Sequence, residues 1–375
     1  NDGGRVMLRR KNIIKKIVGV LALSMVITTS VTGCQSSKSG ENEIDTSSLT
    51  IQEIEEKAKE EGKLASLGMP DTWANWVETW EDIESKYGIK HNDTDMSSAE
   101  EVAKFDAEKN NATADIGDVG ISFGPIAENK GVTMAYKTSY WDEIPDWAKD
   151  DDGDWIVGYT GTIAIITDKT KVDKAPQTWE DLKNGNYKVC VGDVTKATQA
   201  QNAVLSAAYA FGGDESNLQP GIDFFAELAK NGRISSISDA KPANLEKGEI
   251  EVAFLWDFNA LNYADQIDRD RFEITILDEA SVMSGYATII NKYGKNPHAA
   301  MLAREYILSD EGQENLAKGY ARPIRNVELS EDVKSKLLDD SEYKNVITIS
   351  DYEAWEKSAA ELPQKWQQEV LVHVK

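Results

Sequence analysis

Short apolar stretches alternate with amphipathic stretches along most of this chain. The apolar stretches predict strands at residues 64–67, 115–121, 155–167, 189–191, 251–255 and 283–291. The amphipathic stretches predict helices at residues 50–61, 76–87, 98–109, 198–211, 221–230 and 297–309. Two of these helices begin with a capping-box pattern, Thr50 with Glu53 and Ser98 with Glu101. Strands that alternate with helices in this way are typical of an α/β fold.

The length of the chain indicates more than one hydrophobic core. A chain of 375 residues exceeds the size that a single core usually serves, so we expect two lobes. The predicted strands at 155–167 and 283–291 are candidates for crossing between them. We assign residues 49–158 and 284–328 to the first lobe. The second lobe then comprises residues 159–283 and 329–375, with the C-terminal helices.

The first 33 residues have the pattern of an export signal. Basic residues precede a mostly apolar run at 17–27, which is too short to span a bilayer. The segment Val31–Cys34 that follows resembles the bacterial lipobox, whose cysteine becomes diacylated. We predict a lipoprotein signal peptide at 1–33 and lipidation of Cys34. Residues 34–48 are then a flexible tether. The protein is expected to be anchored on the outer face of the cytoplasmic membrane. The alternative is an ordinary cleavage site at which Cys34 is incidental.

The charge balance and the scarcity of metal-ligating residues exclude several classes of partner. With 65 acidic and 41 basic residues, the chain has a net charge of −24 and would repel phosphate backbones, so nucleic acid is not an expected partner. The three histidines are isolated and the two cysteines lie far apart, which predicts no metal site. The chain has no G-x-x-x-x-G-K phosphate loop, and no cofactor is expected. The acidic run Asp150–Asp154 lacks the key carboxylates of a calcium loop and is interpreted as a turn.

The segment Gly120–Gly124 matches the G-x-S-x-G pattern of a nucleophile elbow and follows a predicted strand. A serine of this kind needs a histidine base, and the chain offers His91, His298 and His373. The alternative function is therefore a secreted lipoprotein serine hydrolase that uses Ser122. The preferred interpretation is a ligand-contacting loop in a protein without catalytic residues.

Two further segments carry side chains suited to opposite charges. Thr195, Lys196 and Thr198 surround a predicted helix start, where free N–H groups and an ammonium favour an anion. An ordinary helix cap with a solvated lysine is the alternative. Trp256 and Asp257 follow a predicted strand, where an aromatic ring and a carboxylate suit an ammonium group or a cationic ring. Structural packing of Trp256 is the alternative there.

Several segments resemble those of the extracellular solute-binding proteins of ABC importers, in the branch that includes iron, thiamine, polyamine, phosphonate and sugar-phosphate binders. The resemblance covers residues 62–328 and is carried by segments such as Trp155–Gly161, Pro176–Leu182, Phe254–Trp256 and Gly319–Arg325. It implies a two-lobed α/β fold of the type II periplasmic-binding-protein class. Such a protein closes its lobes on a small molecule and delivers it to an ABC permease in the membrane. The resemblance also implies a monomer that is not an enzyme.

The resemblance assigns a set of residues on six loops to ligand binding. These residues are Asp71, Trp73, Ser122, Phe123, Tyr159, Thr160, Thr162, Thr195, Lys196, Thr198, Trp256, Asp257, Asn259, Ser284 and Tyr286.

Departures from the family pattern narrow the ligand. Iron binders of this type carry adjacent tyrosines where this chain has only Tyr263, which disfavours ferric iron. Polyamine binders carry acidic residues where this chain has Thr195 and Lys196, and a carboxylate where it has Ser284, which puts polyamines in doubt. A basic helix start together with Trp256 and Asp257 instead favours a zwitterionic ligand, such as an aminophosphonate or thiamine phosphate.

Overall fold

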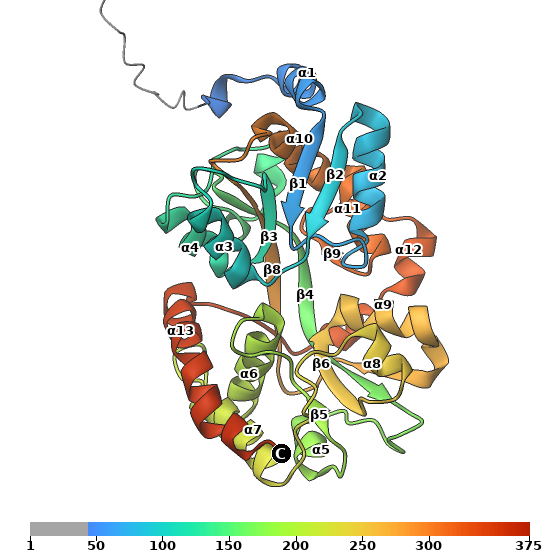
Figure 1. Cartoon of the computed structure of the whole chain (residues 1–375). Coiled ribbons are helices and arrows are strands. Elements are labelled where there is room, and N and C mark those ends of the chain that lie inside the picture. Colours follow the sequence, from blue (N-terminus) through green and yellow to red (C-terminus); the bar gives the residue numbers. More distant parts are fainter. Residues whose placement is uncertain (1–43) are drawn as a thin grey trace, which may run out of the picture. The chain divides into compact units, whose positions relative to one another are not determined.

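The computed structural model describes residues 44–375 (Figure 1). The predicted signal peptide, Cys34 and most of the predicted tether lie outside the described residues. At the end of that tether, Thr46–Ser48 form the 3-10 helix η1, and the Thr46 hydroxyl donates a hydrogen bond to the Ala135 carbonyl at 2.8 Å. Among the described residues, no helix combines the length and the apolar character that crossing a bilayer requires.

The first lobe is built on a mixed sheet with the strand order β2-β1-β3-β8-β4. The first three strands run parallel, whereas β8 runs antiparallel to both β3 and β4. The strands are β1 Lys63–Leu67, β2 Lys90–Thr94, β3 Ile116–Gly120, β8 Ser281–Ile290 and β4 Trp155–Asp168. The helices are α1 Ile51–Glu61, α2 Trp76–Tyr87, α3 Ser98–Ala107, α4 Phe123–Asn129, α10 Pro297–Leu308, α11 Asp310–Lys318 and α12 Glu331–Lys336. The sequence assigned the residues of α12 to the second lobe, but this helix packs on α11 of the first lobe.

The second lobe is built around the other half of β4. There β4 pairs antiparallel with β6 and β7, and β5 extends the sheet by pairing parallel with β6. The strands are β5 Val189–Cys190, β6 Val252–Trp256 and β7 Phe272–Thr275. The helices are α5 Trp179–Asn184, α6 Thr198–Ala210, α7 Gln219–Lys230, α8 Pro242–Glu246, α9 Asp257–Ile267 and α13 Tyr352–Glu369, the last of which packs on α7.

Short elements complete the described chain. Two short strands are β9 Arg322–Pro323, which pairs with β4, and β10 Val346–Thr348, which pairs with β8. The remaining 3-10 helices are η2 Trp141–Glu143, η3 Asp146–Ala148, η4 Arg269–Arg271, η5 Asp340–Tyr343 and η6 Leu371–His373.

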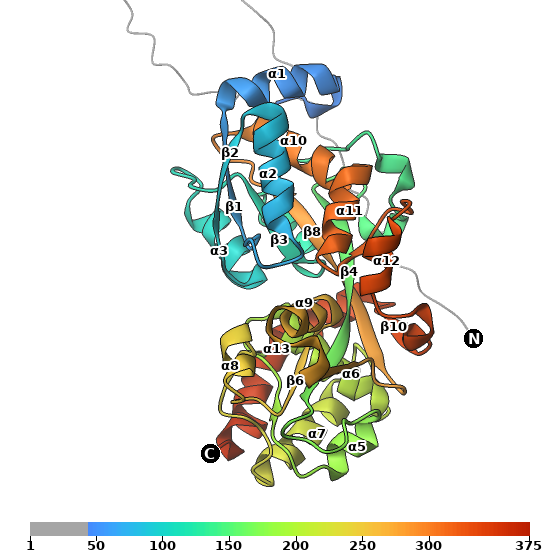
Figure 2. The same cartoon turned by 90° about the vertical axis from the view of Figure 1, so that its right-hand side faces the viewer.

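One strand, β4, belongs to both lobes. It pairs with β8 from Trp155 to Thr162 and with β6 from Ile163 to Thr167. Both views show it passing from one group of elements to the other (Figures 1 and 2). A register shift interrupts its pairing with β8 beside Gly158, which is the behaviour of a β-bulge and increases the local twist. The loops at the carboxyl ends of β1 and β3 are thereby brought opposite the beginning of α6.

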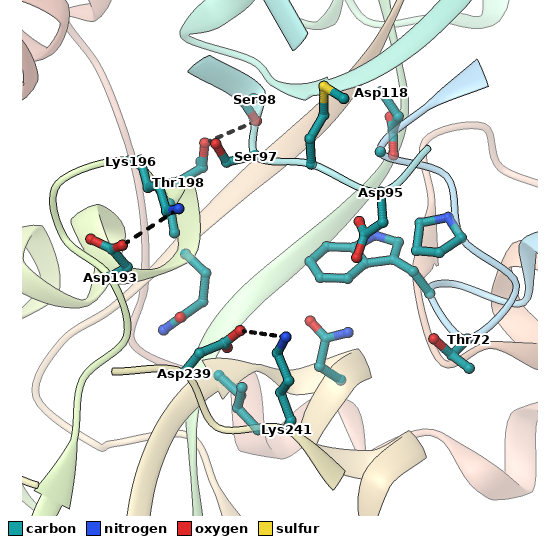
Figure 3. Close-up of a pocket in the computed structure, with 18 of the residues that line it drawn as sticks. Thr72, Asp95, Ser97, Ser98, Asp118, Asp193, Lys196, Thr198, Asp239 and Lys241 are labelled. Atoms are coloured by element: carbon teal, nitrogen blue, oxygen red, sulfur yellow. Dashed lines mark hydrogen bonds and ion pairs between the residues drawn. The ribbon is translucent and has the colours of Figure 1, made fainter. Parts of the chain in front are cut away.

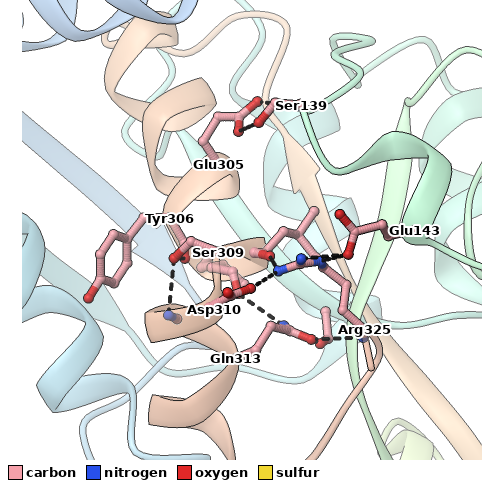
Figure 4. A network of polar contacts seen from close by, with 12 residues as sticks. Ser139, Glu143, Glu305, Tyr306, Ser309, Asp310, Gln313 and Arg325 are labelled. Carbon is pink, nitrogen blue, oxygen red and sulfur yellow. Dashed lines mark hydrogen bonds and ion pairs between the residues drawn. The ribbon is translucent and has the colours of Figure 1, made fainter. Parts of the chain in front are cut away.

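Hydrogen bonds of polar side chains connect the junction of α10 and α11 to the rest of the first lobe (Figure 4). Arg325 donates hydrogen bonds to the Glu143 carboxylate at 2.6 Å, to the Asp310 carboxylate at 2.8 Å and to the Leu308 carbonyl at 2.7 Å. The Gln313 side-chain amide donates to the Gly158 carbonyl at 2.9 Å, next to the bulge in β4. The irregular end of α10 is therefore held to the crossover strand by buried hydrogen bonds.

The alternating pattern of the sequence predicts many elements of the described chain, but not β2, β7, α4 or α9. Trp76–Tyr87 is helical with the predicted bounds, and the capping box of Thr50 is present at the start of α1. The second capping box is displaced by one residue, because Ser97 and Glu100 form it. Ser98 and Glu101 instead point inward and accept hydrogen bonds from the backbone N–H groups of β3. This displacement matters for the site.

Candidate functional site

A cavity of about 450 Å³ lies between the two lobes, and side chains of both line it (Figure 3). Its wall is formed by the loops that follow β1 and β2, the beginnings of α3 and α6, and residues of β3, α8, α9 and β8. Among the described residues, six carboxylates and two lysines line it: Asp95, Glu100, Glu101, Asp118, Asp193, Asp239, Lys196 and Lys241. The excess of carboxylates makes the potential inside the cavity negative.

Asp118 is the most unusual of these carboxylates. It lies in β3 and is only 2 % exposed. Its Oδ2 atom accepts a hydrogen bond from the Tyr159 hydroxyl at 2.6 Å, but Oδ1 has no hydrogen-bond partner in the described part of the chain. Burial raises the pKa of the Asp118 carboxyl well above its usual range, although the Tyr159 hydrogen bond opposes this effect. A buried carboxylate oxygen on the wall of a cavity, with no partner, is a ready acceptor for a ligand donor.

Glu101 lies beside Asp118 and is equally buried, at 1 % exposure. Its Oε2 atom accepts the Asp118 backbone N–H at 3.0 Å. Burial, and then the charge of Asp118, raise the pKa of the Glu101 carboxyl well above its usual range. Gly68 and Gly117 make room for this side chain, because a Cβ atom at either position would lie within 2.7 Å of a Glu101 carboxylate oxygen.

Aromatic rings form one wall of the cavity and are held in place by hydrogen bonds. The Trp73 indole N–H donates to the Tyr159 hydroxyl at 2.7 Å, and the Trp256 indole N–H donates to the Tyr286 hydroxyl at 3.0 Å. The rings of Tyr159 and Tyr286 stack with centroids 5.5 Å apart. Trp73 and Tyr286 reach the cavity from this framework, whereas Tyr159 and Trp256 support them from behind.

The two lysines of the cavity already have partners. The Lys196 ammonium lies 3.4 Å from a Glu100 oxygen and 3.9 Å from an Asp193 oxygen. Lys241 lies 3.7 Å from an oxygen of Asp239. Each cationic side chain is therefore matched by at least one carboxylate of the same wall, and neither offers an uncompensated positive charge.

The beginning of α6 presents backbone donors rather than a side-chain cap. Its N-cap residue is Ala197, which has no side chain that can accept a hydrogen bond. The Thr198 hydroxyl instead donates to the Ser98 hydroxyl of the first lobe at 3.3 Å. Thr195 turns back on its own loop, where its hydroxyl bonds the Asp193 carboxylate. The helix start therefore contributes polar groups to the cavity, but the threonine hydroxyls are used within the protein.

The structure brings some of the sequence-predicted site residues to the cavity and leaves others outside it. Those that line it are Trp73, Lys196, Thr198, Asn259 and Tyr286. Those that do not line it are Asp71, Ser122, Phe123, Tyr159, Thr160, Thr162, Thr195, Trp256, Asp257 and Ser284.

Asp257 is placed differently from the expectation. It lies outside the cavity wall at 1 % exposure, and its carboxylate accepts hydrogen bonds from the Thr162 and Phe258 N–H groups and from the Tyr343 hydroxyl at 3.0, 2.9 and 2.6 Å. Its charge is therefore satisfied by the protein, because the side chain turns toward the crossover strand and the C-terminal segment. This geometry assigns Asp257 a structural role and gives no support to a ligand contact.

The sequence reasoning missed the carboxylates that do line the cavity, above all Asp118 and Glu101. Both carried a signal. Asp118 is the one charged residue within an otherwise apolar or glycine strand at 116–120, and Glu101 shares the buried face of its helix with Phe105. A charge placed among buried positions is costly unless it is paired or neutralised, which makes such a residue a candidate for a functional role.

Ser122 lacks the surroundings of a nucleophile. A strand, a turn and the helix α4 do surround it, as an elbow requires, and it is only 8 % exposed. His91 bonds Ser66 and stacks on Trp80, and His298 bonds Glu61. No histidine of the described chain hydrogen-bonds to Ser122, so the serine hydrolase alternative finds no support here.

The comparisons with known proteins agree with this arrangement. Residues 111–357 match the sequence model of a family described as bacterial extracellular solute-binding protein. The chain belongs to this family. The solute-binding protein described here is 27 % identical to the sulfate-binding protein of Escherichia coli (strain K12) over 171 residues, which are 44 % of this chain and 52 % of the relative. The chain thus spans about half the length of the curated relatives it matches first.

Solved structures extend the likeness to the whole two-lobed fold. The periplasmic binding protein AfuA from Actinobacillus pleuropneumoniae, with fructose 6-phosphate bound, has a TM-score of 0.67 at 21 % identity and covers 83 % of this chain and 99 % of its own. A periplasmic thiamin binding protein has a TM-score of 0.67 at 16 % identity and covers 84 % of this chain and 96 % of its own. The type II two-lobed α/β fold predicted from the sequence is confirmed.

Proposed function

We propose that this solute-binding protein captures a small organic cation outside the cell and delivers it to an ABC permease, without changing it chemically. The observation that carries the proposal is the Oδ1 atom of Asp118, a buried carboxylate oxygen without a hydrogen-bond partner, in a residue that lines the cavity. Burying an unpaired charge costs several kcal/mol, whereas a ligand ammonium or cationic ring would pair it. The anchor at Cys34 stays a prediction from the sequence and belongs to the same proposal.

The rest of the cavity supports a cation. Its carboxylates outnumber its lysines, and both lysines are matched by carboxylates of the same wall. The rings of Trp73 and Tyr286 add π-faces that attract cations. One of the similar structures is a thiamin binding protein, and thiamin carries a cationic ring. These features favour a cation that also presents an aromatic or apolar surface.

The sequence suggested a zwitterionic ligand. Its cationic half stays in the proposal, but a different residue would bind it. Asp257 is occupied by the protein, so Asp118 takes over that role. The anionic half would meet Lys196, whose charge Glu100 and Asp193 already balance. A phosphate group would therefore enter a cavity of net negative charge, which is unfavourable. We narrow the proposal to cations with no phosphate or phosphonate group.

The test is a thermal-shift screen followed by calorimetric titration. Thiamin, choline, putrescine and spermidine represent the cations, and sulfate, fructose 6-phosphate and ferric citrate represent the alternatives. At least one cation should raise the melting temperature, because it binds the folded state alone. A response confined to the anions or to iron would contradict the proposal.

Two buried aspartates form a matched pair for the titration. Asp118→Asn should weaken binding of the responding cation about tenfold to a hundredfold, because one charge-assisted contact is lost. Asp257→Asn removes an equally buried charge outside the cavity wall and should keep the wild-type affinity, provided circular dichroism shows both variants folded. The opposite pattern would return the ligand contact to Asp257.

A further inference from the structure

We propose that the cavity takes up its cation in exchange for a proton held by the Glu101–Asp118 pair. This inference rests on the proposed function and adds a chemical step to it. The two carboxyl groups are 1 % and 2 % exposed, and the only hydrogen bond between the two residues runs from the Asp118 backbone N–H to the Glu101 carboxylate. Such a pair is costly to keep doubly ionised in a buried place.

The groups around the pair do not supply a compensating charge. From β2 and the loop after it, Asp93 and Asp95 face the pair and are themselves acidic. From β4 and β8, the hydroxyl-bearing rings of Tyr159 and Tyr286 face it. The ion pairs of the described residues include neither Glu101 nor Asp118, because Lys196 and Lys241 lie against other carboxylates. A proton is therefore the positive charge that the free protein can hold at this place.

The packing fixes the pair so that it cannot escape into water. Glycine occupies positions 68 and 117, where any Cβ atom would collide with the Glu101 carboxylate. The Tyr159 hydroxyl donates a hydrogen bond to one oxygen of Asp118, and the other oxygen has no hydrogen-bond partner among the described residues. Burial raises the pKa of both carboxyls, which agrees with a proton that is retained when exposed carboxylates have lost theirs.

The exchange is balanced without any further reactant. In the free protein one carboxyl O–H bond holds the proton. When the cation enters, that O–H bond breaks, the proton passes to the solvent, and the resulting carboxylate pairs with the ligand. The charge inside the cavity is therefore the same before and after binding, which avoids the cost of adding an uncompensated charge to a buried site.

The sign of the pH dependence follows from this balance. Below the raised pKa of the pair, binding must remove a proton, so the affinity should rise about tenfold per pH unit where one full proton is released, and level off above that range. The stability of the free protein should change with pH in the opposite direction to the affinity. Its folded state holds more protons than its unfolded state between the ordinary and the raised pKa, so its stability should fall as the pH rises through that interval.

The experiment has one part without ligand and one with it. Carboxyl ¹³C NMR of the free protein should show Glu101 and Asp118 titrating at higher pH than Glu100, whose exposed carboxylate has a pKa lowered by the Ser97 cap. Calorimetric titration then uses whichever of thiamin, choline and putrescine binds most tightly, in two buffers of different ionisation enthalpy. The observed enthalpy should change with the buffer by the amount that one released proton requires.

Variants separate this inference from the proposed function. Glu101→Gln keeps an oxygen that can accept the Asp118 N–H but removes one of the two ionisable carboxyl groups, so it should reduce the proton release and flatten the pH dependence. Asp257→Asn should leave both unchanged. Cation binding without proton release in the wild type would overturn the exchange and leave the proposed function standing. Failure of these three cations and of spermidine to bind would overturn both.

Discussion

Glycine at position 68 determines whether the Glu101 carboxylate can occupy its place beside the cavity. Gly68 adopts a left-handed backbone with φ +66°, and a Cβ atom there would lie 2.1 Å from a Glu101 oxygen. Gly88 has nearly the same backbone, φ +71°, but nothing lies within 4 Å of the corresponding Cβ position. Both positions therefore favour glycine because of their left-handed backbone. Only position 68 also lacks the space for a Cβ atom.

Replacing each glycine by alanine separates the two reasons. Gly88→Ala should lower the free energy of unfolding by about 1 kcal/mol and leave cation binding unchanged, because only the left-handed backbone is strained. Gly68→Ala should cost more and should weaken cation binding at least about tenfold, because the Glu101 side chain must move. Urea unfolding and calorimetric titration measure the two effects. Equal affinity in both variants would show that the position of Glu101 does not matter for the ligand.

At the residue scale, the sequence predicted part of the cavity wall but did not predict which buried carboxylates lie there. Trp73, Lys196 and Tyr286 were expected at the ligand and do line the cavity. Asp257 was expected to be free for a ligand, but its partners Thr162 and Tyr343 lie 95 and 86 residues away in the chain. Contacts of such sequence separation leave no local pattern, so whether a buried carboxylate is already satisfied depends on the tertiary fold.

The secondary structure elements were more predictable, because their signals are local. The period of the apolar residues defined α2, and Thr50 with Glu53 defined the start of α1. The helix α3 begins at the predicted residue, Ser98, but its capping box was misplaced by one residue, since Ser97-Glu100 and Ser98-Glu101 both satisfy the capping-box spacing. Only the contacts of Ser98 and Glu101 with β3 decide between these two registers. The segment after β3 was expected to be a loop, but it forms the beginning of α4.

The joint between α10 and α11 offers a test at the level of elements. Arg325→Met should lower the free energy of unfolding by about 1.5–3 kcal/mol, because the buried Leu308 carbonyl loses its charged donor. Arg269→Met removes an arginine whose ion pair with Asp265 is largely exposed, and should cost less than about 1 kcal/mol. Urea unfolding of both variants provides the comparison. Equal losses would mean that the network in Figure 4 contributes no more than a surface ion pair.

At the scale of the whole molecule, direct contacts join the two lobes around the cavity. Lys196 of the second lobe faces Glu100 of the first, and the Asn262 side chain donates a hydrogen bond to the Thr72 carbonyl at 2.9 Å. The Tyr320 hydroxyl bonds the Asp265 carboxylate on the same side as Asn262. The Lys196–Glu100 pair is about half exposed and therefore contributes little free energy. This ion pair therefore opposes separation of the lobes only slightly, whereas the buried hydrogen bond from Thr198 to Ser98 also joins them there.

Small-angle scattering tests this motion. The radius of gyration should decrease when the responding cation is added to the wild-type protein, because binding favours the closed arrangement. Asp118→Asn at the same cation concentration should show a smaller decrease, in proportion to its weaker binding. Identical scattering with and without a saturating cation would contradict a closing motion.

β8 is synthesised after β5, β6 and β7 of the second lobe, yet it pairs with β3 in the middle of the first lobe's sheet. During synthesis, residues 163–275 are continuous and can assemble the second sheet while the first still lacks a central strand. One edge of β3 and one edge of the neighbouring half of β4 have no partner until residues 283–290 have emerged. The newly made chain is therefore most exposed to wrong strand pairing in its earlier half, which is where a holding chaperone would be needed before export.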